Sequence, residues 1–111
     1  MRPHYKVLKM SRPKKMSSGD LSSAVDGLAG WTIENGKLHR EFAFPDFSTA
    51  WGFMSRCALV AEKMDHHPEW FNVYGKVIVD LSTHDAGGVT QYDVNMAAQM
   101  NVIASAIFPK A

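Results

Sequence analysis

Three of the five histidines in this 111-residue chain, His66, His67 and His84, lie in one stretch that also carries acidic and aromatic residues. An imidazole with an unperturbed pKa of roughly 6.5 can give or take a proton near neutral pH. His66 and His67 are adjacent, Pro68 follows them, and Trp70 adds a flat side chain nearby. This combination indicates general acid–base catalysis on a planar ligand.

The two adjacent histidines lie where a long helix is expected to end, because Pro68 disfavours helix at the residue before it. Carbonyl dipoles at a helix C-terminus favour a cation, so one imidazole would stay protonated and act as an acid. A histidine beside it would then tend to stay neutral and act as a base. Glu62 precedes His66 at i, i+4 spacing, so we expect its carboxylate to orient that ring.

A metal centre is the chemical alternative for this cluster. Three histidines and a carboxylate could ligate zinc or iron. Adjacent residues on a helix diverge by about 100°, however, so His66 and His67 would not face one ion together. The sequence therefore favours proton transfer over a metal centre.

Cys57 is the only cysteine, and it lies in the middle of an apolar helical stripe. We expect it to be a small buried residue and not a nucleophile. No disulfide within the chain is possible, which fits a reducing compartment. The cytoplasm is the expected location, with the nucleus as a second one.

Hydrophobic periodicity and turn residues predict the elements that would position these side chains. Asn35-Gly36 is a strong hairpin signal, and Asp46 is a plausible helix N-cap. Thr90 with Asp93 has the spacing of a capping box. We expect a short helix near residues 21–28, strands at 31–34, 37–44, 70–74 and 76–83, and helices at 47–65 and 90–108.

This order predicts an α+β fold of two layers, a four-stranded antiparallel sheet with helices on one face. The core would be ββαββα, preceded by the short helix. In this layout the end of the long helix can approach residues 82–85 at the end of the last strand. The three histidines would then share one site.

Both long helices carry apolar stripes that bear on burial and assembly. The first stripe is expected to lie in the core; its members are Phe47, Ala50, Trp51, Met54, Cys57, Ala58, Ala61 and Met64. The last helix has two stripes, one with Val94, Ala97 and Ala98 and another with Met96, Met100, Ile103 and Ile107. A single small sheet can cover only one of them, so we expect a homo-oligomer.

Charge is unevenly distributed along the chain. The formal net charge is +1, which gives no overall field that favours nucleic acid or an anionic membrane. Six of the twelve Lys and Arg residues precede the first acid, Asp20. We interpret residues 1–19 as a flexible basic tail and residues 20–111 as a single domain. No apolar run reaches the length of a membrane span.

The chain resembles the pterin-4a-carbinolamine dehydratases, also known as dimerization cofactors of homeodomain transcription factors, over residues 31–108. The likeness is densest at residues 46–47, 51–56, 61–74 and 81–85. The family pattern is met by Glu62, the His66-His67-Pro68 run, Tyr74, His84 and Asp93.

The resemblance implies dehydration of 4a-hydroxytetrahydrobiopterin to quinonoid dihydropterin in tetrahydrobiopterin recycling, with no cofactor. The catalytic residues that it implies are His66, His67, His84 and Glu62. The substrate-binding residues that it implies are Asp65, His66, His67, Ser82, Thr83, His84, Asp85 and Asp93. We expect Trp70 to add a flat wall to this site or to belong to the core. Among these, we expect His67 and His84 to be the proton-transfer pair.

The resemblance also implies a second kind of function. Some members of the family bind the dimerization helix of a homeodomain transcription factor through a surface that otherwise builds a dimer of dimers. A non-catalytic dimerization cofactor, or coactivator, is therefore the alternative. The partners to consider are a pterin, further copies of the chain and such a helix.

Overall fold

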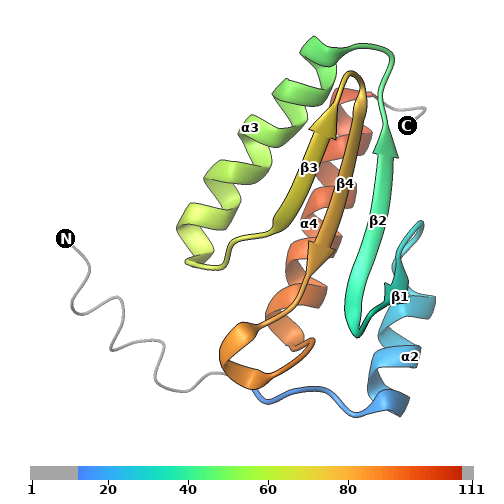
Figure 1. The fold of residues 1–111 in the computed structure, drawn as a ribbon, viewed down its shortest axis with the longest axis vertical. Helices are drawn as coiled ribbons and strands as arrows, with labels where there is room; N and C mark the ends of the chain where they lie inside the picture. The colour runs from blue at the N-terminus through green and yellow to red at the C-terminus, as the bar shows by residue number, and fades with distance from the viewer. Residues whose placement is uncertain (1–12, 109–111) are drawn as a thin grey trace, which may run out of the picture.

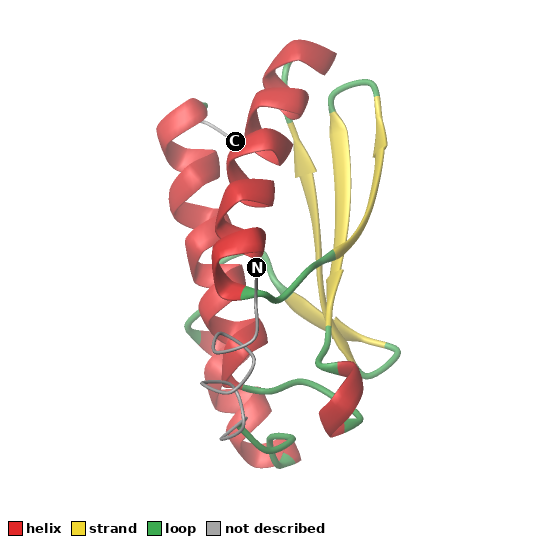
Figure 2. Ribbon diagram, turned by 90° about the vertical axis from the view of Figure 1, so that its left-hand side faces the viewer, coloured by secondary structure: helices red, strands yellow, loops and turns green. Residues whose placement is uncertain are grey.

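Two long helices cover one face of a four-stranded antiparallel sheet in the computed structural model, which describes residues 13–108 (Figures 1 and 2). In chain order the elements are α2 (Ser18–Asp26), β1 (Thr32–Glu34), β2 (Lys37–Ala43), α3 (Phe47–Met64), β3 (Glu69–Val73), β4 (Lys76–Leu81), η1 (His84–Ala86) and α4 (Gln91–Ile107). The strand order is β1-β2-β4-β3. The predicted α+β fold is confirmed.

Local signals in the sequence set most of the boundaries. Asn35 (φ 54°) and Gly36 (φ 76°) both adopt positive φ, as a two-residue hairpin turn with the twist of its strands requires. The carboxylate of Asp46 accepts a hydrogen bond from the backbone N–H of Thr49 at 2.7 Å and caps α3. The capping box predicted at the start of α4 is also present.

The end of β4 differs from its predicted boundary at residue 83. The strand ends at Leu81, and Thr83 instead forms an isolated antiparallel bridge with Gly88. The Thr83 N–H donates to the Gly88 carbonyl at 2.8 Å. The chain therefore folds back on itself directly after the strand, and this loop carries His84.

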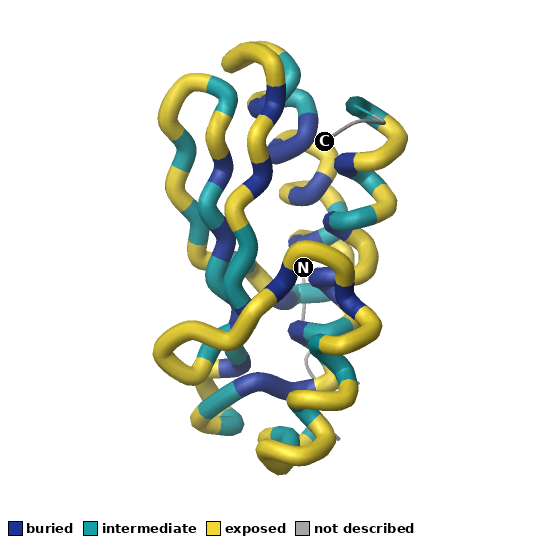
Figure 3. Tube along the Cα trace, turned by 90° about the vertical axis from the view of Figure 1, so that its right-hand side faces the viewer, coloured by how far each residue is buried: buried dark blue, intermediate teal, exposed yellow. Residues whose placement is uncertain are grey.

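The core lies between the sheet and the two helices (Figure 3). Alternate residues of β4, Val77, Val79 and Leu81, face it, as the two-residue period of a strand requires. From α4 the Met96 stripe faces the same core, with Met100 fully buried. The other predicted stripe is divided, because Ala97 is fully buried and Val94 packs against the core, whereas only Ala98 is exposed. Val102, outside both predicted stripes, is also exposed.

The predicted core stripe of α3 is partly wrong. Phe47 and Trp51 are more than half exposed and stack on each other, whereas Phe53, outside the predicted stripe, is completely buried. The helix carries apolar residues around more than one face, so periodicity alone did not fix which face turns inward. Phe53 packs against Phe42 of β2 and against Phe44, which directly follows that strand. The ring-centroid distances are 4.6 and 5.0 Å.

The folded part begins earlier than the predicted tail boundary. Helix α2 starts at Ser18, and the side chain of Ser17 caps it by accepting from the Asp20 N–H. Met16 donates its N–H to the Val89 carbonyl at 2.8 Å, and its side chain packs against the core. The rest of the predicted tail, residues 1–12, lies outside the described residues.

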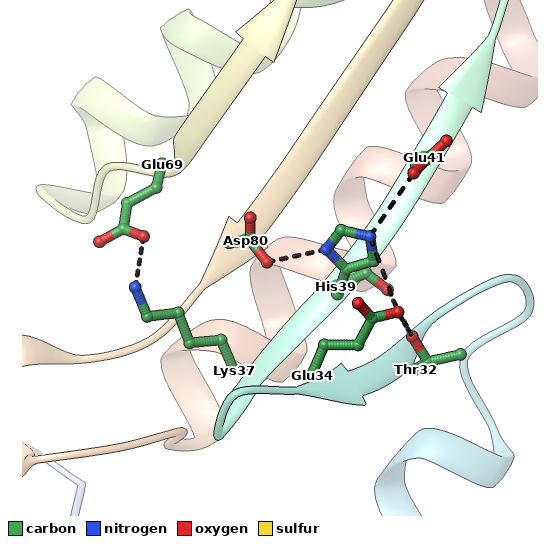
Figure 4. Close-up of polar contacts among 7 residues, drawn as sticks. All are labelled: Thr32, Glu34, Lys37, His39, Glu41, Glu69 and Asp80. Carbon is green, nitrogen blue, oxygen red and sulfur yellow. Dashed lines mark hydrogen bonds and ion pairs between the residues drawn. The ribbon is translucent and has the colours of Figure 1, made fainter.

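The sheet face opposite the helices carries a polar row. The register aligns Thr32, His39, Asp80 and Glu69 across all four strands. The His39 Nδ1 lies 2.8 Å from an Asp80 carboxylate oxygen. Figure 4 draws this contact. Lys37 forms a 2.6 Å ion pair with Glu69 beside this row.

None of the helices formed by residues 13–108 is both long enough and apolar enough to cross a membrane.

Candidate functional site

The end of α3 and the loop after β4 line an open cavity of about 210 Å³, which we call the histidine cavity. Its lining residues are Asp65, His66, His67, Ser82, Thr83, His84 and Asp85. The approach of the long helix to residues 82–85, expected from the layout, is thus present. All three candidate histidines share this cavity.

A left-handed cap at Asp65 aims the two adjacent histidines in different directions. Asp65 adopts φ 53° and ψ 42°, and its N–H returns to the carbonyls of Ala61 and Glu62. The His66 N–H also returns to the Ala61 carbonyl, at 3.0 Å, which closes the helix end. As a result His66 is buried at 7% exposure, whereas the His67 side chain is 58% exposed.

His66 is anchored by a buried carboxylate. Its Nε2 lies 2.5 Å from Oδ1 of Asp93, which is fully buried. Oδ2 of the same carboxylate accepts from the Thr83 hydroxyl at 2.8 Å and from the Thr90 N–H at 2.9 Å. An ionised carboxylate only accepts hydrogen bonds, so we assign the Nε2 proton to His66 as the donor.

The hydroxyl groups behind His66 form a chain with one consistent direction. Thr83 uses its proton on Asp93, so it accepts from the Thr90 hydroxyl, which lies 2.7 Å away. Thr90 in turn accepts from the Tyr92 N–H at 3.2 Å. Every hydroxyl group in this series of hydrogen bonds has both a donor and an acceptor partner. Such a network holds its groups in fixed positions.

Glu62 contacts a different histidine from the one that its spacing predicted. Its carboxylate oxygen lies 3.0 Å from Nε2 of His67, five residues on, in a pair that is more than half exposed. The i, i+4 expectation for His66 is wrong because the helix has already turned into its left-handed cap by that position. Glu62 therefore orients His67.

His84 reaches the cavity from the loop after β4, at the first position of η1. The Thr83 carbonyl accepts from the N–H groups of both Ala86 and Gly87, which makes the turn tight. Gly87, at φ 76°, ends it. His84 and Asp85 are exposed at this rim, while Thr83 at the base of the turn is buried.

Two of the predicted binding residues do not line the histidine cavity. Trp70 is half-buried and packs against the core, and its contact with a ligand stays a prediction. Asp93 lies behind the wall and contacts two of the lining residues, His66 and Thr83. Thr90 was not singled out as a site residue, although the capping box around it was visible in the sequence.

Two chemical alternatives can be compared with the geometry. Within residues 13–108, no group of three or more His, Cys, Asp or Glu side chains is placed to hold a metal ion. Cys57 is fully buried, and desolvation raises the pKa of its thiol to about 12. The thiolate that a nucleophile requires is therefore suppressed at neutral pH.

Comparison with known proteins gives one consistent result. The sequence model of the family described as pterin 4 alpha carbinolamine dehydratase matches residues 14–103. A Solibacter usitatus protein with the provisional name of pterin-4-alpha-carbinolamine dehydratase is 52% identical over 91 residues, 82% of this chain and 96% of that relative. A Rhodopseudomonas palustris protein with the same provisional name is 50% identical over 99 residues, 87% of this chain and 98% of that relative.

Solved structures share the fold. A crystal structure described as a transcriptional coactivator/pterin dehydratase from Brucella melitensis is 48% identical, with a TM-score of 0.80 over 82% of this chain and 99% of that chain. A pterin dehydratase-like protein identified as a RuBisCO assembly factor in the alpha-carboxysome has a TM-score of 0.56 over 67% of this chain and 86% of that chain. That protein is 20% identical, so the likeness concerns the fold alone.

Proposed function

This chain belongs to the pterin-4a-carbinolamine dehydratase family, and we propose that it dehydrates 4a-hydroxytetrahydrobiopterin to quinonoid dihydropterin by histidine acid–base catalysis. The observation that supports this most is the histidine cavity. His67 and His84 come from separate elements and line one cavity, with His66 fixed in its wall.

The reaction needs two proton transfers and no change in oxidation state. The 4a hydroxyl must be protonated so that the C4a–O bond can break and release water. A ring N–H must lose its proton so that its electron pair can form the new double bond to C4a. An acid and a base on either side of a planar ring supply both transfers, without a metal or an organic cofactor.

The geometry favours His67 and His84 as this pair. Both lie at the exposed rim of the cavity, where they can exchange protons with solvent after each turnover. His66 is buried and bonded to Asp93, so it acts as a positioning residue and a wall. Asp65, Ser82, Thr83 and Asp85 complete the walls that would hold the pterin.

The direct test is stopped-flow absorbance on chemically generated 4a-hydroxytetrahydropterin, with and without the protein. Dehydration should accelerate in proportion to protein concentration. His67→Ala and His84→Ala should each lower kcat by roughly tenfold or more, because each removes one proton-transfer group. The matched control is His39→Gln on the open sheet face, which should leave the rate unchanged.

Two results would count against this function. Folded wild-type protein that gives no acceleration would exclude the dehydratase activity. Full activity in both the His67 and the His84 variant would exclude the assigned roles. Circular dichroism of each variant separates a lost catalytic group from a lost fold.

A second function is supported by one observation, the solved relative described as both a transcriptional coactivator and a pterin dehydratase. By analogy this chain would bind the dimerization helix of a homeodomain transcription factor. Such binding without any rate acceleration, measured by titration with a labelled partner helix, would favour the coactivator over the enzyme.

The assembly that we propose is a homotetramer built as a dimer of dimers. Its support is the helical layer, where Leu59 of α3 and Val102 of α4 are 73% and 68% exposed. Large apolar side chains left exposed on helices are typical of a surface that another chain covers. The lone cysteine remains compatible with action in the cytoplasm.

A further inference from the structure

A second and larger cavity adjoins the histidine cavity. Its volume is about 560 Å³, and it shares Ser82, Thr83 and His84 with the histidine cavity. We call it the adjoining cavity. Its other walls come from the segment before α2, which includes Lys15, and from the start of β2 at Lys37.

The N-terminal wall is fixed against the body of the protein. Met16 is bonded to Val89 and packs against the core. The Lys15 side chain lies along Gly88, where a Cβ would come within 2.8 Å of the lysine Cε. This segment runs beside the loop that carries η1 (Figure 1), so the two cavities meet at that loop.

Size separates the roles of the two cavities. Small-molecule sites have volumes of roughly 300–1,000 Å³, so the histidine cavity at about 210 Å³ is small for a whole substituted pterin. The adjoining cavity opens at His84, one of the two proposed proton-transfer groups. A ring held between the histidines would thus direct a substituent into the larger space.

Charge distinguishes the two cavities as well. The histidine cavity has two carboxylates in its lining, Asp65 and Asp85. Among the described residues that line the adjoining cavity there is no Asp or Glu, while Lys15 and Lys37 contribute two ammonium groups. Glu69 pairs with Lys37 from outside this lining, so the charge of Lys15 is the main one left for a ligand.

We propose that the adjoining cavity receives the substituent of the pterin ring and selects a substituent that ends in an anionic group, a carboxylate or a phosphate. This inference rests on the proposed function, because it places the ring in the histidine cavity. Lys15 is the specificity residue, and Lys37 is a second cation in the same lining. Serine hydroxyls from residues 17 and 18 add polar groups to the same wall.

The experiment compares four 4a-hydroxytetrahydropterins in the stopped-flow assay. Their substituents are a methyl group, a neutral dihydroxypropyl chain, a chain ending in carboxylate and a chain ending in phosphate. Wild-type protein should show a KM about fivefold lower for the anionic chains than for the neutral one, the effect expected of one partly exposed charge pair. The carboxylate and phosphate arms show which anion is preferred.

Variants assign the effect to the cavity. Lys15→Ala should abolish the preference for anionic chains. We expect KM for the anionic chains to rise to that of the neutral chain, and kcat to stay unchanged. The matched control is Lys76→Ala, which removes the same charge at the start of β4. At 3.3 Å per residue, this position is about 17 Å from the end of the strand that leads into the cavity. That variant should keep the preference.

A binding measurement keeps this inference separate from the catalytic proposal. Fluorescence quenching of the corresponding oxidised pterins reports affinity without turnover. Equal KM values and equal affinities for neutral and anionic chains would overturn the inference while leaving the dehydratase intact. A preference for anionic chains that depends on Lys15, seen in binding but without turnover, would support the inference and count against the proposed reaction.

Discussion

His66 and His67 are neighbours in the chain but occupy different environments. The left-handed cap at Asp65 buries one ring against Asp93 and leaves the other at the rim with Glu62. A sequence shows two equal histidines, and only the backbone turn distinguishes them. The buried ring is positioned, and the exposed ring is free to exchange protons with solvent.

The first prediction concerns Asp93. Replacement by Ala would leave three buried donors unpaired, the His66 Nε2–H, the Thr83 hydroxyl and the Thr90 N–H. We expect the free energy of unfolding to fall by about 3–5 kcal/mol, because each buried donor left without an acceptor costs about 1–3 kcal/mol. Urea denaturation checks this value, and Asp93→Asn, which keeps an acceptor oxygen, should lose less.

The control for Asp93 is Asp26→Asn, an exposed aspartate at the end of α2. It should change the unfolding free energy by no more than about 0.5 kcal/mol, like most surface substitutions. An Asp93→Ala variant as stable as this control would mean that the buried network does not hold His66.

The second prediction concerns His39 on the open sheet face. Its hydrogen bond to Asp80 raises the pKa of the imidazole, against an opposing effect of burial and with further help from Glu34 and Glu41. Because the folded-state pKa exceeds the unfolded value, protonated His39 stabilises the fold. This contribution is complete below about pH 6.5 and is lost as pH rises through the raised folded-state pKa.

The measurement is the unfolding free energy of wild type and His39→Gln across pH. The wild type should exceed His39→Gln in unfolding free energy by more near pH 5.5 than near pH 8.5. These two values lie roughly one pH unit or more on either side of the ordinary imidazole pKa. In an Asp80→Asn background the pH dependence of this difference should largely disappear. A difference that stays constant with pH would show that the Asp80 contact does not depend on protonation.

At the scale of elements, the sequence predicts best what neighbouring residues decide. The Asn35-Gly36 turn, the Asp46 cap and the Thr90–Asp93 capping box each depend on a few consecutive residues, and each is present. The inward face of α3 depends on the whole sheet beneath it. Phe53 is buried there because Phe42 and Phe44 meet it, which periodicity along one helix could not show.

The third prediction concerns the β3–β4 turn. A Cβ at Gly75 would lie 2.3 Å from the Phe44 carbonyl oxygen, and the Phe44 N–H donates to Gly75 at 2.8 Å. Gly75→Ala must therefore move the end of β2 away from the hairpin. We expect a loss of about 1–3 kcal/mol in unfolding free energy, as for other overpacked sites, measured by urea denaturation.

Gly52 in the middle of α3 provides the matched control, because a Cβ there would meet nothing within 4 Å. Gly52→Ala should be neutral or should stabilise the protein by up to about 1 kcal/mol, since alanine favours helix. Equal stability of the two alanine variants would contradict the close approach at Gly75.

At the scale of the whole molecule, the site depends on pieces that are distant in sequence. The layout of elements and the family resemblance were enough to predict that residues 65–67 and 82–85 meet. They did not predict the adjoining cavity, because the segment around Lys15 was assigned to a tail with no packing role. Its docking depends on contacts with Gly88 and Val89, more than seventy residues away.

The fourth prediction concerns assembly. Light scattering at micromolar concentration should give about four times the chain mass, falling to a dimer on dilution, because the exposed apolar residues of the helical layer need a cover. Val102→Glu should weaken the assembly, since it would place a charge in the covered face. Ser23→Glu, an exposed position on α2, is the control, and a monomer mass for the wild type would refute the tetramer.

The measurement that tests the central claim most directly is a double-mutant cycle in the stopped-flow dehydration assay. Wild type, His67→Ala, His84→Ala and the double variant are compared on the same carbinolamine. If the two rings act as one acid–base pair, the double variant should lose little more rate than either single variant, because groups that work as a unit are not additive. A double variant that dehydrates the substrate as fast as wild type would contradict the account.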